Sequence, residues 1–264
     1  MSRAPLDVPA LSAGLESPWV RLSVVDETAS TNADLLGVAA STPEGTVLVA
    51  EYQTAGRGRL DRAWTSPPRS GLTFSVLVRP GTPRTTWGWL PLLSGVAVCD
   101  AVGAAGLPAM LKWPNDVLLG AEQRKGAGIL VQVAGEAAVI GIGLNVSTTA
   151  DELPVPTAAS LATEGGEVER TTLLATILTE LGYQYLRWRD ARGNAEACGL
   201  AADYHERCAT LGQNVTVTTA GGATLRGLAT SIDAEGRLRV TAEGREHVVA
   251  AGDVEHIRAG AHER

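Results

Sequence analysis

Hydrophobic residues follow two different spacings over the first 208 positions of the chain. Short apolar runs that end at glycine, proline or asparagine are typical of buried strands. They predict strands at 22–25, 46–50, 71–79, 129–133 and 137–146. Stretches in which apolar residues recur every three or four positions are typical of helices that pack on a sheet. They predict helices over 31–39, 86–102, 171–189 and 195–207.

The pattern changes near residue 209, where short alternating segments are separated by glycine-containing turns. Strands are expected at 214–218, 225–232, 237–241 and 248–257. Short strands at close, even spacing are typical of a small barrel, here one of about five strands. We therefore expect two domains, 1–208 and 209–264.

The first 18 residues are rich in proline, alanine and serine and predict a tail with at most one helical turn. No secretory signal and no helix-turn-helix module fit before Trp19. The longest apolar region, Leu90 to Leu111, contains Asp100 and Pro108, so we interpret it as a buried helix and a loop rather than a membrane span.

Composition narrows the function classes. A net charge of −7 is atypical of nucleic-acid-binding proteins, which usually carry a basic surplus. The cysteines form no CxxC pair and the histidines do not cluster, so neither a disulfide framework nor a zinc site is expected. Absence of a disulfide framework agrees with a reducing cytoplasm.

Lys112 and Lys125 are the only two lysines in the sequence. Apart from the histidines, every other basic residue is an arginine. They are either solvated by chance or retained because a compact ammonium can follow a moving carboxylate or phosphate oxygen. Trp113-Pro114-Asn115-Asp116 predicts a positioned loop beside the first lysine. Gly126-Ala127-Gly128 lets the backbone approach a ligand beside the second, which favours the functional interpretation.

Three further stretches contain side chains of the kind that bind ligands. Ser30-Thr31-Asn32 starts a helix and either caps it or donates hydrogen bonds to a small polar ligand. The run Gly56 to Trp64 follows a buried strand with alternating glycine and arginine, which favours an anion-binding loop over a solvated one. Asn145 ends a strand and either reads an adenine edge or holds a turn. Neither a phosphate-binding GxxxxGK[ST] loop nor a dinucleotide fingerprint is present.

Together these motifs resemble the biotin–protein ligase family, and the resemblance extends from about Val24 to Arg258. The motifs are Ser30-Thr31-Asn32, Glu51 to Trp64, Lys112-Trp113-Pro114-Asn115-Asp116, Lys125-Gly126-Ala127-Gly128 and Gly141 to Val146. The chain looks like the short form of the family, without a DNA-binding domain or repressor function. The resemblance implies an α+β fold, in which a mixed β-sheet flanked by helices, as in class II aminoacyl-tRNA synthetases, precedes an SH3-like barrel.

The resemblance also implies a reaction. Biotin and ATP, with Mg²⁺, give biotinyl-5′-adenylate and pyrophosphate, and a lysine of a biotin carboxyl carrier domain of an acyl-CoA carboxylase then takes the biotinyl group. The implied protein is a cytoplasmic monomer or homodimer that binds neither DNA nor a membrane.

Residue roles follow from the resemblance. The implied catalytic residues are Lys112, Arg59, Lys125 and Asp116. The implied biotin-binding residues are Ser30, Thr31, Asn32, Gln53, Gly56, Arg57, Gly58, Arg59, Trp64, Lys125 and Gly128. The implied ATP-binding residues are Arg57, Lys112 and Asn145. Asp116 has two candidate roles, in holding Mg²⁺ or in positioning the carrier lysine; other metal ligands are unknown.

Three positions depart from the family pattern. Asp61 replaces a glycine in the arginine loop, Gly126 replaces a leucine and is expected to loosen its strand, and Ala159 replaces a threonine near the nucleotide. Two other functions are considered. A lipoate or octanoate ligase or transferase shares the fold, but such transferases need a cysteine that these motifs lack. An RNA-binding protein would use the arginine loop, but the net acidity disfavours it.

Overall fold

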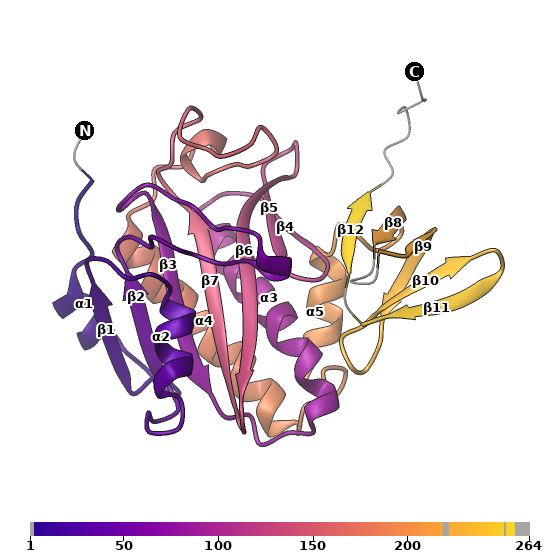
Figure 1. The fold of residues 1–264 in the computed structure, drawn as a ribbon, viewed down its shortest axis with the longest axis horizontal. Coiled ribbons are helices and arrows are strands. Elements are labelled where there is room, and N and C mark those ends of the chain that lie inside the picture. Colours follow the sequence, from indigo (N-terminus) through magenta and orange to yellow (C-terminus); the bar gives the residue numbers. More distant parts are fainter. Residues whose placement is uncertain (1–2, 219–221, 251, 257–264) are drawn as a thin grey trace.

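A seven-stranded mixed sheet forms the centre of the molecule (Figure 1). The computed structural model describes residues 3–218, 222–250 and 252–256. In spatial order the strands are β1 (Arg21–Val25), β2 (Thr46–Ala50), β3 (Gly71–Val78), β7 (Ala137–Asn145), β6 (Arg124–Ala134), β5 (Asp116–Leu119) and β4 (Ala109–Lys112). The β1–β2 pair is parallel and the other neighbouring pairs are antiparallel, which confirms the expected mixed sheet.

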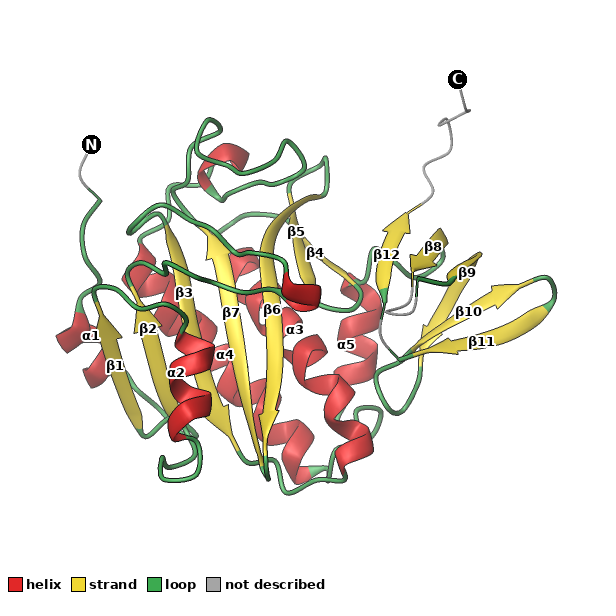
Figure 2. Cartoon of the chain, viewed as in Figure 1, coloured by secondary structure: helices red, strands yellow, loops and turns green. Residues whose placement is uncertain are grey.

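Helices cover both faces of this sheet (Figure 2). One face carries α2 (Thr31–Val38) and the arginine loop with its short 3-10 helix η1 (Arg59–Asp61). The other face carries α3 (Trp89–Ala104) and α4 (Arg170–Asp190), and α5 (Leu200–Arg207) packs against α3. Short 3-10 helices, η2 (Arg84–Gly88) and η3 (Ala162–Glu164), lie in the connections.

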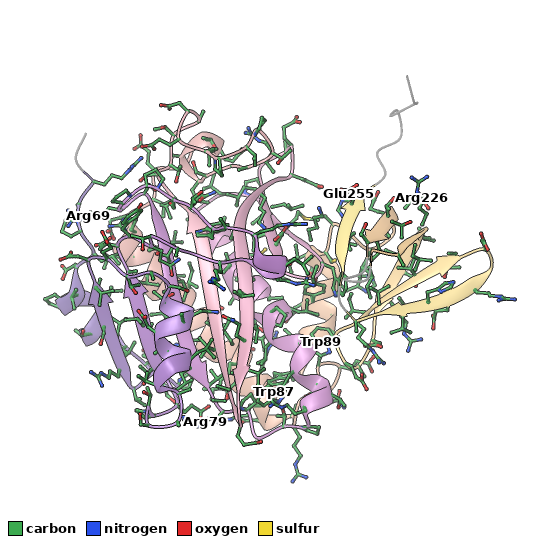
Figure 3. The ribbon with its side chains drawn as sticks, viewed as in Figure 1. Arg69, Arg79, Trp87, Trp89, Arg226 and Glu255 are labelled. Atoms are coloured by element: carbon green, nitrogen blue, oxygen red, sulfur yellow. The ribbon has the colours of Figure 1, made fainter. Side chains whose placement is uncertain are left out.

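Helix α3 is the apolar segment that the sequence placed inside the protein. The stretch Arg84–Ala104 is long and apolar enough to cross a membrane by length and composition, but 72% of its most apolar 18-residue window is buried in the fold. Trp89, the first residue of α3, and Trp87, in the preceding η2, are both buried, and Figure 3 labels them. Burial raises the pKa of the Cys99 thiol to about 12, so Cys99 is protonated at neutral pH, as expected of an inert core cysteine. These observations confirm a core helix.

Three secondary-structure predictions were wrong in detail. The hairpin of β4 and β5 was missed because both strands are only four residues long and flank the turn that the sequence predicted. Strand β6 begins at Arg124, before its apolar run. Helix α5 begins at Leu200 rather than at residue 195, because Gly199 interrupts the chain with a φ of 79°.

The N-terminal segment is more ordered than a tail. Helix α1 (Val8–Ala13) is capped at its N-terminus by Asp7, whose side chain accepts a hydrogen bond from the backbone of Ala10. Leu6 and Leu11 are buried and belong to the main core. The sequence lacked a clear period here because so short a helix buries few residues.

The C-terminal part is a five-stranded antiparallel sheet, in agreement with a small β domain. Its order is β11 (Arg245–Val249), β10 (Leu238–Ala242), β9 (Thr224–Ile232), β8 (Asn214–Thr218) and β12 (Asp253–His256). The single strand expected at 248–257 is two strands, and Ile257 lies outside the described residues. The division of the chain at residue 209 stays a prediction.

Two tryptophans attach this sheet to the larger one. Trp89 Nε1 donates to the backbone oxygen of Ala234 at 3.1 Å, and Trp113 Nε1 donates to that of Gly236 at 3.1 Å. Gly88 lets the same turn approach closely, because a Cβ there would lie 2.2 Å from the oxygen of Glu235. The turn therefore locks the C-terminal sheet beside the loop that carries Lys112.

Candidate functional site

A pocket of about 470 Å³ lies on the face of the main sheet that carries α2. It is lined by the start of α2, the arginine loop, the β4–β5 turn, strands β6 and β7, a loop at 154–158 and strand β12. Of the predicted site residues, the lining contains Ser30, Thr31, Asn32, Gln53, Arg57, Gly58, Arg59, Trp64, Lys112, Asp116, Lys125, Gly128 and Asn145. Gly56 is not in the lining. Motifs spread over more than a hundred residues thus meet at one cavity, while their individual roles remain predictions.

Polar side chains gather at the N-terminus of α2. Ser30 caps the helix, and its Oγ accepts a hydrogen bond from the backbone of Ala33 at 3.4 Å. Gln53 Oε1 accepts from the backbone N–H of Thr31 at 2.8 Å. Ser30, Thr31 and Asn32 are all buried, although they line a cavity. Ser30 therefore caps the helix while Ser30, Thr31 and Asn32 line the cavity, and their contact with a ligand stays a prediction.

Glycines of the central strands make room for the side chains above them. A Cβ at Gly143 would lie 2.4 Å from Trp64 Cε2, and one at Gly141 would lie 2.1 Å from Asn32 Oδ1. A Cβ at Gly128 would contact both Trp64 and Lys125 at 3.4 Å. The strand backbone therefore forms the floor of the pocket, with the Trp64 ring lying directly on it.

The arginine loop is folded back on itself. Arg57 pairs with Ala63, and the backbone N–H of Gly58 donates to the oxygen of Arg62 at 2.7 Å. Leu60 at its tip has a left-handed backbone, with a φ of 53°, and precedes Asp61, the residue that replaces a glycine of the family pattern.

Asn115 connects the arginine loop to the sheet. Arg59 Nη1 donates to Asn115 Oδ1 at 3.3 Å, and Asn115 Nδ2 donates to the backbone oxygen of Ile129 at 2.9 Å. Asn115 belongs to one of the motifs found in the sequence, but no role was predicted for it. Its side chain places one guanidinium of the loop beside the turn that follows Lys112.

The two lysines enter the pocket from β4 and β6, the strands on either side of β5. Lys112 ends β4 and pairs with Asp116 across the hairpin. Lys125 Nζ lies 2.6 Å from Asp116 Oδ1, although the contact is an ion pair without the angles of a good hydrogen bond. The turn between them includes a cis Trp113–Pro114 bond. Two cations and one carboxylate thus face the same cavity.

Gly126 corrects one expectation about this strand. A Cβ at Gly126 would lie 2.2 Å from Leu119 Cδ1, so Leu119 fills the space beside it. The register of β5 against β6 shifts at this point, between Val117 and Leu118, and β6 continues unbroken. The glycine is therefore an accommodated bulge residue and does not loosen the strand.

Asn145 and Ala159 hold the loop after β7. Asn145 Nδ2 donates to the backbone oxygen of Ala159 at 3.0 Å, and the Ala159 N–H donates to the oxygen of Lys125 at 2.8 Å. Asn145 therefore holds a turn, as one interpretation had it, and also lines the cavity. Contact with an adenine stays a prediction.

Other lining residues were not found from the sequence. Val254 and Glu255 come from β12, and Figure 3 labels Glu255 on the C-terminal sheet beside the main one. Pro154, Val155 and Thr157 come from the long loop between β7 and α4. No local signal marks these positions. Ser75 does not line the pocket but contacts two lining residues, Thr31 and Asn32, and a serine inside the apolar run of β3 is a signal visible in the sequence.

In the described part of the chain, neither a cluster of three metal-binding side chains nor a cysteine lies at the pocket. Among these residues no cluster of three or more His, Cys, Asp or Glu side chains is placed to hold a metal ion; His262 lies outside them. Cys99, Cys198 and Cys208 do not line the pocket. Burial also raises the pKa of the Cys208 thiol. A cysteine nucleophile is therefore not placed at this cavity.

Comparison with known proteins gives a consistent result. A family model described as the biotin/lipoate A/B protein ligase family matches residues 23–147, and one described as the biotin protein ligase C terminal domain matches residues 210–257. The biotin–[acetyl-CoA-carboxylase] ligase of Mycobacterium tuberculosis (strain ATCC 25618 / H37Rv) is 45% identical over 97% of each chain. The enzyme of the same name from Paracoccus denitrificans is 31% identical over 80% of this chain and 90% of that one.

A solved structure agrees with these relatives. The biotin protein ligase from Aquifex aeolicus, in complex with biotin and ATP, superposes with a TM-score of 0.76 at 26% identity. The match covers 91% of this chain and 100% of that chain.

Proposed function

The chain belongs to the biotin–protein ligase family, and from this premise we propose that it activates biotin with ATP and transfers it to a lysine of a biotin carboxyl carrier domain. The observation that carries the proposal is the single pocket at which the motifs meet. Its volume lies within the range of about 300–1,000 Å³ that is usual for small-molecule sites.

The first step joins two anions. A carboxylate oxygen of biotin attacks the α-phosphorus of ATP, an O–P bond forms, and pyrophosphate leaves. Both reactants are negative, so cations must offset their repulsion and stabilise the charge that spreads in the transition state. Arg57, Arg59, Lys112 and Lys125 all line the pocket and supply such charge. We assign Lys112 and Lys125 to the carboxylate and α-phosphate, and the arginine loop to closure over the adenylate.

In the second step the ε-amine of the carrier lysine attacks the acyl carbon of the adenylate. An amide bond forms, the amine loses a proton, and AMP leaves. Asp116 is the candidate for positioning that amine, because its carboxylate lies in the pocket beside Lys125. The partner is the carrier domain of an acyl-CoA carboxylase, in keeping with the names of the relatives.

Mg²⁺ is compatible with the residues at the pocket. Mg²⁺ commonly binds through one or two carboxylates together with substrate phosphates, and Asp116 and Glu255 are the carboxylates of the lining. When bound, the ion neutralises charge on the triphosphate. Either carboxylate can hold it, and for Asp116 this role competes with positioning the carrier lysine.

The polar end of the pocket, formed by Ser30, Thr31, Asn32 and Gln53, favours biotin over lipoate. The ureido ring of biotin offers N–H and C=O groups to Ser30, Thr31 and Gln53, whereas the dithiolane ring of lipoate offers neither. Lipoate would leave buried polar groups without partners, at a cost of about 1–3 kcal/mol each. The absence of a cysteine from the lining also disfavours an octanoyl transferase that works through a thiolate.

We further propose that the protein works in the cytoplasm, as a monomer or homodimer, and does not bind DNA. Its net charge of −7 gives no electrostatic attraction for a polyanion. A gel-shift assay with double-stranded DNA should therefore show no specific retention.

Pyrophosphate–ATP exchange tests the proposal. We expect exchange with biotin and none with lipoate or without an acid. Addition of a carrier domain should then give a biotinylated lysine. Exchange with lipoate in place of biotin, or exchange with neither acid, would show that the proposal is wrong.

A further inference from the structure

Ser75 lies behind the polar end of the pocket without lining it. It sits in the middle of β3 and its exposed fraction is 0%. Its Oγ is nevertheless 2.7 Å from Thr31 Oγ1 and 2.6 Å from Asn32 Oδ1. A buried hydroxyl in an apolar strand thus touches two residues at the wall of the site.

The surroundings of Asn32 determine which way its amide points. Asn32 Nδ2 lies 3.2 Å from the backbone oxygen of Leu130 and 2.9 Å from Gln132 Oε1. A backbone carbonyl only accepts hydrogen bonds, so the amide nitrogen must face it. Asn32 Oδ1 therefore faces Ser75. Gly141 leaves the space that this oxygen occupies, since a Cβ there would lie 2.1 Å from it.

The positions of the hydroxyl protons follow by counting donors. Each hydroxyl has one proton. Asn32 Oδ1 is an acceptor, so the proton of Ser75 is used in that contact at 2.6 Å. The 2.7 Å contact between Ser75 and Thr31 then needs the proton of Thr31, because two lone pairs at that distance repel each other. The chain of hydrogen bonds runs from Thr31 through Ser75 to Asn32.

Thr31 Oγ1 can therefore only accept a hydrogen bond from a ligand. Gln53, in contrast, can donate one. Its Oε1 accepts the backbone N–H of Thr31 at 2.8 Å, so its Nε2, which carries two protons, is on the other side of the amide. Gln53 Oε1 also lies 3.1 Å from Thr31 Oγ1 and can only accept, so the Thr31 proton is shared between Ser75 and Gln53 and is not free for a ligand. An acceptor and a donor stand side by side in the lining.

We propose that Ser75 is a positioning residue that makes the Thr31 hydroxyl an acceptor, so that the pocket selects a ligand with an N–H beside a C=O. A cyclic urea has this chemistry, and the inference rests on the proposed function, in which the ureido ring of biotin is that ligand. Ser75 acts through Thr31 and touches no substrate itself.

A double-mutant cycle on the full-length protein tests this role. We expect Ser75→Ala to weaken biotin binding about three- to tenfold by calorimetry, the range that one hydrogen bond supports. The KM for biotin should rise similarly, while kcat and the KM for ATP stay the same. If Ser75 acts through Thr31, the double variant Ser75→Ala/Thr31→Val should bind biotin as Thr31→Val does.

Controls separate this role from a structural one. Ser94→Ala also removes a buried serine hydroxyl, which donates to the backbone of Leu90 at 2.7 Å in α3, and should leave biotin binding unchanged. Ser75→Cys keeps the volume with a weaker hydrogen-bonding group and serves if the alanine variant does not fold.

Two results would overturn the inference: unchanged biotin affinity in the Ser75 variants, or additive losses in the double variant. If the wild-type protein bound no biotin, the proposed function would fall as well. If the wild type binds biotin and the Ser75 variants bind it equally well, only this inference is wrong and the proposed function stands.

Discussion

Arg170 Nη1 lies 2.7 Å from Glu51 Oε2, and both side chains are more than nine-tenths buried. The same guanidinium donates to the backbone oxygens of Gly71 and Ala4, and Glu51 Oε1 accepts from the backbone of Leu6. Glu51 and Gly71 stand at the two ends of the segment that carries the arginine loop. The pair therefore ties both stems of that segment to α4 and to the N-terminal segment.

Breaking this pair should be costly. Arg170→Met leaves a buried carboxylate without its partner, which costs about 3–5 kcal/mol of the free energy of unfolding. Arg189→Met in the same helix breaks an exposed pair with Asp190 and should cost about 1 kcal/mol or less. Chemical denaturation measures both. Equal losses in the two variants would show that the buried pair has no special role.

Lys112 is the firmest candidate for a catalytic cation. Lys112→Ala should slow biotin-dependent pyrophosphate exchange about 100- to 1,000-fold, as the loss of one group that stabilises transition-state charge does. The fold should persist, because the side chain is only partly buried. Arg245→Ala, at an exposed position in β11, is the matched control and should retain full exchange. Normal exchange in the lysine variant would exclude a catalytic role.

Gly143 should tolerate no side chain. In Gly143→Ala the new Cβ would lie 2.4–2.8 Å from three atoms of Trp64, so the ring must move off the floor of the pocket. We expect biotin affinity, measured by calorimetry, to fall about tenfold or more, which corresponds to about 1.4 kcal/mol. Gly103→Ala in α3 is the control. Nothing lies within 4 Å of its Cβ, so affinity should not change and the helix should gain stability. Unaltered affinity in the Gly143 variant would contradict the position of Trp64.

The attachment of the C-terminal sheet should weaken in acid. Burial opposes ionisation of Asp233, but hydrogen bonds from the backbone and side chain of Arg237 and the backbone of Glu235 outweigh it and lower the pKa. A carboxyl whose folded-state pKa is lowered contributes stability above its unfolded pKa, about 3.9, and loses it as the pH falls through the folded value.

The Asp233 turn accepts hydrogen bonds from Trp89 and Trp113, so this loss should loosen the contact between the sheets. Thermal unfolding at pH 7 and at pH 3 should show a smaller drop in Tm for Asp233→Asn than for the wild type. The same drop in both proteins would exclude Asp233 as a source of acid sensitivity.

Much of the fold and the site followed from local sequence. The apolar runs of β2, β3 and β7 and the periodic apolar stripe of α4 are local patterns, so their assignment needed no tertiary information. Ser30-Thr31-Asn32, the arginine loop and the two lysines were found in the same way, because each is a contiguous motif. The pairing of Asp116 with Lys125 was not predicted, although both residues were named.

Packing alone decided the rest. Arg170 meets Glu51 across 119 positions of sequence, and Val254 and Glu255 reach the pocket from a different sheet, so no local pattern reports either contact. From the sequence, Gly126 was expected to loosen β6, whereas in the fold Leu119 fills the space beside it. From the sequence, Ser75 is only a polar residue in a buried strand. Its effect on the Thr31 proton depends on Asn32, Leu130 and Gln132 being held around it, and that arrangement exists only once the sheet and α2 have packed together.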